Sequence, residues 1–295
     1  MGKAMTARTF AWAAAAFAAV ALTACGGGES ASEAAGAGGS PEGVYGGTLT
    51  GLTSSAFQMV ILENGDLWAL YGAQGASTFA VSGLIQGAGA WSQGNYSVAQ
   101  ARDFGFQPAL AGRLSGRFED TTAKTISGTG SFAGTTITFS GGPIAGSLYR
   151  YDTPASLTAT AGTWTLTAIS GEVIALNVSS DGRFSGASNA GCTLSGTLAP
   201  RPSGKNVFNM TLTFGPAPCL LAGQGASGIA LVTPLATGQS QLIVAAIDAA
   251  RSVGTAASGE TRPSADLAWF RSSRCGAAAC NRSMALVARA RQSRL

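Results

Sequence analysis

The residues of this chain with the most reactive side chains are its five cysteines, and no histidine accompanies them. A cysteine thiol can be acylated, can form a disulfide or can bind a metal as the thiolate. The absence of histidine excludes a Ser-His-Asp or Cys-His catalytic site. It also leaves the closely spaced pair Cys275 and Cys280 short of the four ligands of a tetrahedral zinc site, so we predict no metal site.

The first cysteine follows a stretch with the pattern of an export signal. Lys3 and Arg8 form a positive n-region, and an apolar run of about 13 residues, 10–22, is too short to span a bilayer. The segment Leu22-Thr23-Ala24-Cys25 resembles the lipobox of bacterial lipoprotein precursors. That resemblance implies removal of residues 1–24 and a lipid on the thiol of Cys25. A buried N-terminal helix that ends in cysteine is the alternative.

The other cysteines are candidates for disulfides, because an exported protein reaches an oxidising compartment. Cys192 and Cys219 lie in one β-rich segment, and we expect a disulfide that closes a loop of about 27 residues and stabilises by roughly 3 kcal/mol. Two buried free thiols are the alternative. Cys275 and Cys280 could pair with each other.

The two ends of the chain differ in composition from its middle. Residues 25–42 are rich in Gly, Ala and Ser without a large apolar side chain, and they predict a tether with a root-mean-square reach of roughly 20 to 25 Å. Residues 254–295 lack strand alternation and carry six arginines from Arg271 onward. We expect this extension to be largely disordered or to form a short helix; an altered reading frame is the alternative.

Between these ends the pattern is that of a β protein with two domains, at 43–149 and 150–253. The 42 glycines and the low charge of 11% suit short strands joined by tight turns. Gly43-Val44-Tyr45 and Gly162-Thr163-Trp164 open two similar series of about eight alternating strands, which indicates an internal repeat. We predict an all-β fold of two tandem antiparallel up-and-down β-barrels, because closure removes unpaired sheet edges. A sandwich is the competing architecture.

Gly162-Thr163-Trp164 resembles the G-x-W opener of calycin barrels, such as lipocalins and avidin, and Gly43-Val44-Tyr45 is a weakened copy. The resemblance implies structural roles for Trp164 and Tyr45, with Trp164 plugging one end of its barrel. It concerns the fold and names no ligand. Each half carries its own opener, so we expect 43–149 and 154–250 to fold alone.

The acidic residues offer little for catalysis. Between the signal and Phe270 the chain has 14 acidic and 10 basic residues, so the folded part is mildly acidic and carries no nucleic-acid footprint. A carboxylate pair is possible in principle. However, Glu63, Asp66, Asp120 and Asp181 stand at expected hairpin turns, where local hydrogen bonding accounts for them. We therefore expect no enzyme and no cofactor.

The combination of lipobox, Gly-rich tether and tandem barrels resembles the surface lipoproteins of Gram-negative bacteria, of the transferrin-binding-protein-like and factor-H-binding types. The resemblance covers the architecture over most of residues 25–250 and carries over no partner. Gly26 after the lipid cysteine, rather than Asp, is similar to lipoproteins that are sorted onward to the outer membrane. Our hypothesis is a lipid-anchored, non-enzymatic lipoprotein of the cell outer membrane, facing the periplasm or the exterior, whose two β-domains bind a protein or glycan partner. A periplasmic protease inhibitor, a small-ligand carrier with a calycin-like barrel and a structural spacer are the alternatives.

Overall fold

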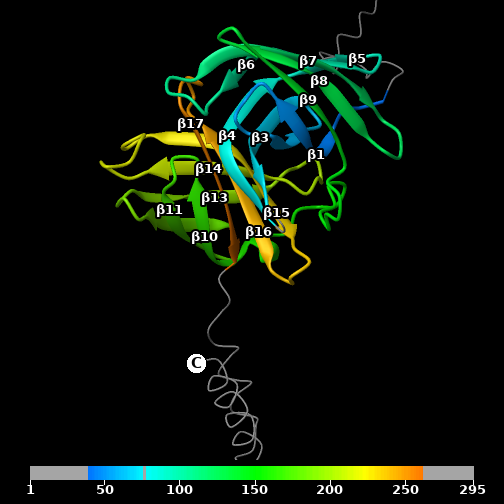
Figure 1. Cartoon of the computed structure of the whole chain (residues 1–295). Helices are drawn as coiled ribbons and strands as arrows, with labels where there is room; N and C mark the ends of the chain where they lie inside the picture. The colour runs from blue at the N-terminus through cyan, green and yellow to red at the C-terminus, as the bar shows by residue number, and fades with distance from the viewer. Residues whose placement is uncertain (1–38, 76–77, 262–295) are drawn as a thin grey trace, which may run out of the picture. The chain divides into compact units, whose positions relative to one another are not determined.

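The computed structural model describes residues 39–75 and 78–261 (Figure 1). In these two ranges the chain forms seventeen strands and one short helix, α1 (Leu157–Thr160). The strands make two closed antiparallel barrels, so the predicted all-β fold with two tandem barrels is confirmed and the sandwich is wrong. No helix in these ranges is long and apolar enough to cross a membrane.

The first barrel has eight strands and one short addition. β1 pairs with β9 on one side and β4 pairs with β6 on the other, which closes the sheet, while β5 continues along β6 beyond the end of β4. The strands are β1 (Gly43–Thr50), β2 (Ala56–Ile61), β3 (Asp66–Gln74), β4 (Phe79–Ala88), β5 (Ala90–Ser92), β6 (Asn95–Asp103), β7 (Leu110–Glu119), β8 (Thr125–Phe132) and β9 (Thr135–Gly142).

The second barrel is an uninterrupted meander in which the last strand, β17, pairs with the first, β10. Its strands are β10 (Gly162–Ala168), β11 (Val173–Val178), β12 (Arg183–Ser188), β13 (Thr193–Pro200), β14 (Phe208–Phe214), β15 (Gly225–Pro234), β16 (Ser240–Ile247) and β17 (Gly254–Thr261). The predicted extension at 254–295 is therefore wrong for its first eight residues, which close the barrel. The rest of that extension lies outside the described residues.

The two openers occupy corresponding places in their barrels. The Tyr45 hydroxyl donates to the Pro41 carbonyl (2.8 Å), and the Trp164 indole donates to the Thr160 carbonyl (2.8 Å), in each case four residues earlier. Both aromatic side chains are buried, at 1% and 0% exposure. Each opener thus fixes the chain that leads into its barrel and fills part of the core.

The barrels also pack against each other, and both belong to one compact unit of the chain. The outer faces of β2, β3 and β4 lie against the outer faces of β15, β16 and β17, where one apolar cluster joins side chains of both barrels; Figure 1 shows β4 alongside β17. Central members of this cluster are Val60, Trp68, Leu84, Ile229, Ile243 and Ile247. These strands are therefore buried on both faces, which explains unbroken apolar runs such as 59–62 and 242–247.

Polar contacts surround this shared apolar cluster. Arg201 donates from Nε and Nη2 to Glu63 Oε1 at 3.1 and 2.7 Å. The Phe79 carbonyl accepts hydrogen bonds from Gln241 Nε2 (3.2 Å) and Ser258 Oγ (2.9 Å). These bonds join the two barrels at several points around the apolar contact.

Candidate binding cleft between the barrels

The barrel interiors are filled with their own side chains. A hollow inside the first barrel measures about 40 Å³, and one inside the second about 60 Å³. Ligand pockets commonly measure roughly 300 to 1,000 Å³. Neither hollow reaches that size.

A larger hollow lies where the two barrels meet, and we call it the inter-barrel cleft. It has a volume of about 280 Å³. Its walls are mainly apolar and come from the outer faces of β2, β3, β15 and β16 and from the segment 144–149. Six of the apolar lining residues are Val60, Trp68, Leu70, Ile229, Leu231 and Ile243.

Amide side chains are the main polar groups of the inter-barrel cleft. Gln58 Nε2 donates to Gln74 Oε1 at 3.3 Å, and Gln74 is exposed to solvent. Gln241 is buried, and its amide donates to the Phe79 carbonyl. The cleft thus combines an apolar floor with uncharged donors and acceptors near solvent, an arrangement that suits apolar side chains with a polar backbone.

A separate groove of about 550 Å³ runs over the outside of the second barrel, on β11 to β14. Hydroxyl and amide side chains line it, with Arg183 at one side. Arg183 pairs with Asp181 (3.3 Å), and both side chains are exposed. The groove is polar, in contrast to the inter-barrel cleft.

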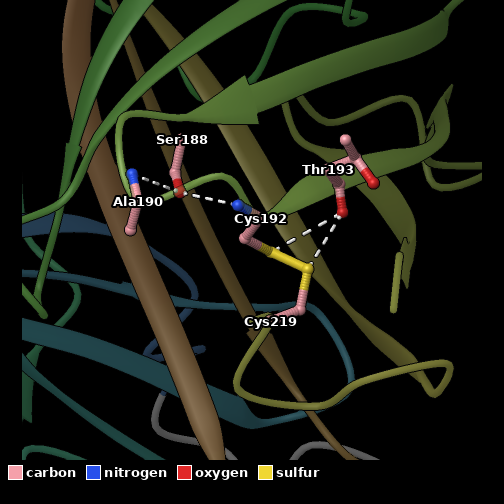
Figure 2. The surroundings of a disulfide bond; sticks show 5 residues. All are labelled: Ser188, Ala190, Cys192, Thr193 and Cys219. Carbon is pink, nitrogen blue, oxygen red and sulfur yellow. Dashed lines mark hydrogen bonds between the residues drawn. A yellow bond between two sulfur atoms is a disulfide. The ribbon is translucent and has the colours of Figure 1, made fainter. Parts of the chain in front are cut away.

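Of the five cysteines predicted to carry a lipid or to form disulfides, the structure describes one pair. Cys192 and Cys219 form a disulfide that joins the β12–β13 turn to the loop after β14 (Figure 2). Ser188 Oγ accepts hydrogen bonds from the backbone amides of Ala190 (3.3 Å) and Cys192 (3.2 Å) and so orders the turn. The Thr193 carbonyl oxygen lies 3.6 and 3.2 Å from the two sulfur atoms. Cys25, Cys275 and Cys280 lie outside the described residues.

The expectation of local hydrogen bonding at hairpin turns is confirmed for Asp66 and Asp181, whereas Asp120 and Glu63 accept hydrogen bonds from residues far away in the sequence. Asp66 and Asp181 accept hydrogen bonds from Asn64 and Ser179 in their own turns, and Asp120 accepts one from the Ser40 amide (3.1 Å). Burial alone would raise the pKa of Glu63, but the hydrogen bonds and charge of Arg201 lower it below its ordinary value. Within the described residues no group of three His, Cys, Asp or Glu side chains could hold a metal.

One buried carboxylate escaped the sequence analysis. Asp103 is 1% exposed and accepts hydrogen bonds at Oδ1 from the Tyr71 hydroxyl (2.9 Å) and the Gly105 amide (2.9 Å). Its burial raises the pKa of this carboxyl despite the two donors. Asp103 lies at the end of β6 on the inner side of the first barrel, where its hydrogen-bond donors are Tyr71 and Gly105.

The inter-barrel cleft also escaped the sequence analysis, although a signal for it was present. The unbroken apolar runs at 59–62 and 242–247 depart from the alternation of neighbouring strands, and such runs are typical of strands buried on both faces. These runs belong to strands that form the contact between the barrels, but the runs alone do not show what packs against the strands or that a hollow remains there.

We found no match to this chain among protein-family models, curated proteins or solved structures.

Proposed function

We propose that this protein is a lipid-anchored lipoprotein of the cell outer membrane that acts as a non-enzymatic binding module for a protein partner, with the inter-barrel cleft as its binding site. The lipobox-like segment before Cys25 supports the anchor. The observation that carries the binding role is the contrast between filled barrel interiors and an apolar cleft of about 280 Å³ between them.

The chemistry of the cleft favours a protein segment as the occupant. A hollow of about 280 Å³ with apolar walls accepts one large or a few small apolar side chains. The amides of Gln58 and Gln74 can then pair with the backbone of the bound segment. A glycan partner is the second candidate, and the hydroxyl-lined groove on the second barrel is where it is expected.

Site-specific photo-crosslinking in intact cells tests the protein partner. A photoreactive residue is placed at Ala145 or Ala236, which line the cleft and are exposed, and as a control at Thr211 on the outer groove. We expect a protein adduct from the cleft positions and none from Thr211. The adduct is identified by mass spectrometry, and the purified partner is then titrated against the protein.

A matched pair of variants checks that the cleft itself is responsible. Leu231→Glu places a charge on the cleft wall, whereas Val173→Glu places one on an exposed position of β11 outside it. We expect at least a tenfold weaker partner affinity for Leu231→Glu, because a buried charge opposes docking of an apolar segment, and no change for Val173→Glu. A small molecule retained by the wild type in native mass spectrometry, with no protein adduct, would instead indicate a carrier.

The anchor is tested independently. Cys25→Ser removes the thiol that would carry the lipid, so we expect loss of labelled fatty-acid incorporation and of membrane fractionation. Incorporation of label by this variant would contradict the proposed lipid anchor at Cys25. Protease treatment of intact cells then distinguishes exterior from periplasmic domains.

A further inference from the structure

We propose that the outer face of β6 and β7 rests against the anionic phospholipid headgroups of the membrane, through Arg102, Arg113 and Arg117. We call these three residues the arginine face. The inference rests on the proposed lipid anchor, and it adds a second membrane contact that fixes how the first barrel faces the bilayer.

The register of the sheet places the three arginines together. Arg102 pairs with Ala111, so Arg113 is its diagonal neighbour on β7, at a Cβ distance of roughly 7 to 8 Å. Arg117 follows four residues later on the same side of β7, about 13 Å from Arg113. Arg113 and Arg117 are exposed, and Arg102 is half-buried.

The protein leaves these charges without acidic partners. In the part of the chain that the structure describes, none of the three arginines forms an ion pair, whereas Arg183 and Arg201 do. The residues opposite Arg113 and Arg117 on β8 are Ser131 and Ser127.

Acidic groups occur only at one end of this face. Glu119 lies two residues beyond Arg117 and accepts a hydrogen bond from the Thr125 hydroxyl (3.3 Å), and Asp120 follows it. The centre of the face therefore carries guanidinium groups and hydroxyls, which bind phosphate oxygens well.

The residues that lead from the predicted tether into the first barrel lie close to one end of the arginine face. The Ser40 amide donates to Asp120 Oδ2 (3.1 Å), and Lys124 Nζ donates to the Glu42 carbonyl (3.1 Å). The chain coming from Cys25 thus reaches the fold at the Arg117 end of β7. Thirteen residues separate Cys25 from Gly39, a root-mean-square span of about 20 Å for a flexible segment.

These placements favour a membrane surface over a soluble polyanion. The exposed large apolar residues of the described chain are Phe106, in the loop between β6 and β7, and Leu148, Val173 and Leu220, and none of them lies within the strands β6 to β9. The contact is therefore electrostatic and peripheral. A basic residue next to an anionic bilayer strengthens binding by roughly fivefold, so two arginines contribute roughly 25-fold.

The test uses the full-length lipidated protein in two kinds of vesicle: phosphatidylcholine alone, and phosphatidylcholine with about a third phosphatidylglycerol. A fluorophore is placed at Thr129, in the middle of this side of β8, or at Thr197 on the second barrel as a control; both are exposed. A headgroup-labelled quencher lipid reports how close each fluorophore lies to the bilayer. We expect strong quenching at Thr129 with phosphatidylglycerol, little without it, and little at Thr197.

Two double variants with equal net charge separate the arginine face from charge in general. Arg113→Ser with Arg117→Ser should abolish the quenching at Thr129, whereas Arg150→Ser with Arg183→Ser, two exposed positions elsewhere, should preserve it. Equal loss in both variants, or equal quenching in both kinds of vesicle, overturns the inference. Retention on polygalacturonate that depends on Arg113 and Arg117, without any response to phosphatidylglycerol, assigns the face to an acidic glycan instead.

The same samples report the anchor separately. Sedimentation with phosphatidylcholine vesicles depends on the lipid alone, so its absence contradicts the anchor. In that case sedimentation with phosphatidylglycerol vesicles tests the arginine face directly: dependence on Arg113 and Arg117 supports it, and no sedimentation overturns it.

Discussion

At the scale of single residues, Asp103 is a buried carboxylate that forms no ion pair among the described residues. It has two hydrogen-bond donors, Tyr71 and Gly105, and no cation among the described residues pairs with it. Its raised pKa means that the folded state binds a proton more readily than the unfolded chain does. The stability that this proton provides is complete below the unfolded pKa of about 3.9 and is lost as the pH rises through the folded pKa.

We predict that Asp103→Asn is at least as stable as the wild type at pH 7. The amide oxygen of asparagine can accept both hydrogen bonds, and the buried charge is gone. The difference in unfolding free energy between variant and wild type should shrink as the pH falls through the folded pKa of Asp103. Urea titrations at several pH values measure it. A variant that is less stable at pH 7 would show that the charge itself is needed.

Trp164 gives the matching prediction for the second barrel. The side chain is fully buried and its indole is hydrogen-bonded to Thr160, so Trp164→Ala leaves a cavity and an unpaired carbonyl. We expect a loss of about 3 to 5 kcal/mol in unfolding free energy. Trp164→Phe, which keeps most of the volume, should cost less. Similar losses for both variants would mean that the hydrogen bond matters more than the packing.

At the scale of elements, the sequence predicted strands whose residues alternate between buried and exposed, but it missed a strand that does not alternate. Phe208-Asn209-Met210-Thr211 alternates clearly, and β14 buries Phe208 and Met210 while it exposes Asn209 and Thr211. β17 was missed because Ala256, Ala257 and Ser258 are all buried, so its sequence does not alternate. It lies between the core of its barrel and the neighbouring barrel, which no pattern within the strand reveals.

The closing strand yields a direct prediction. A chain that ends at Ala250 lacks β17, so β10 and β16 each lose one of their two partner strands and the second barrel stays open. We therefore expect 154–250 to be disordered or aggregated, and 150–261 to show the circular dichroism of a β protein. A folded 154–250 fragment would show that closure by β17 is dispensable.

The disulfide, confirmed as predicted, acts on loops rather than on strands. It ties the β12–β13 turn to the loop after β14 across 27 residues. Replacing both Cys192 and Cys219 by Ser should lower the unfolding free energy by about 2 to 4 kcal/mol, chiefly by relaxing the unfolded chain. Denaturant titration under oxidising conditions measures this loss. The reduced wild type should match the variant, and a mismatch would point to an effect of the serines themselves.

At the scale of the whole molecule, the contact between barrels is the feature that the sequence could not supply. Periodicity reports which face of a strand is buried, but it does not report what buries it. Ile229 and Ile243 project outward from a closed barrel, and their burial comes from packing against the outer faces of β2 to β4 and the segment that links the barrels. The candidate site depends on this packing, because its walls come from segments about 170 residues apart, such as Val60 and Leu231.

This packing predicts that the two barrels unfold together. Apolar burial between them couples their stabilities, so the full chain should show one cooperative transition although each closed barrel holds its own core.

Ile243→Asp places a charge in the contact without entering the barrel interior. We expect it to separate the transition into two, as followed by circular dichroism and by tryptophan fluorescence, to which Trp68 and Trp91 contribute from the first barrel and Trp164 from the second. Thr211→Asp, on an exposed outer position of the same barrel, should leave a single transition. Two transitions in the wild type would mean that the shared cluster contributes little, and the inter-barrel cleft would then open and close as the barrels separate.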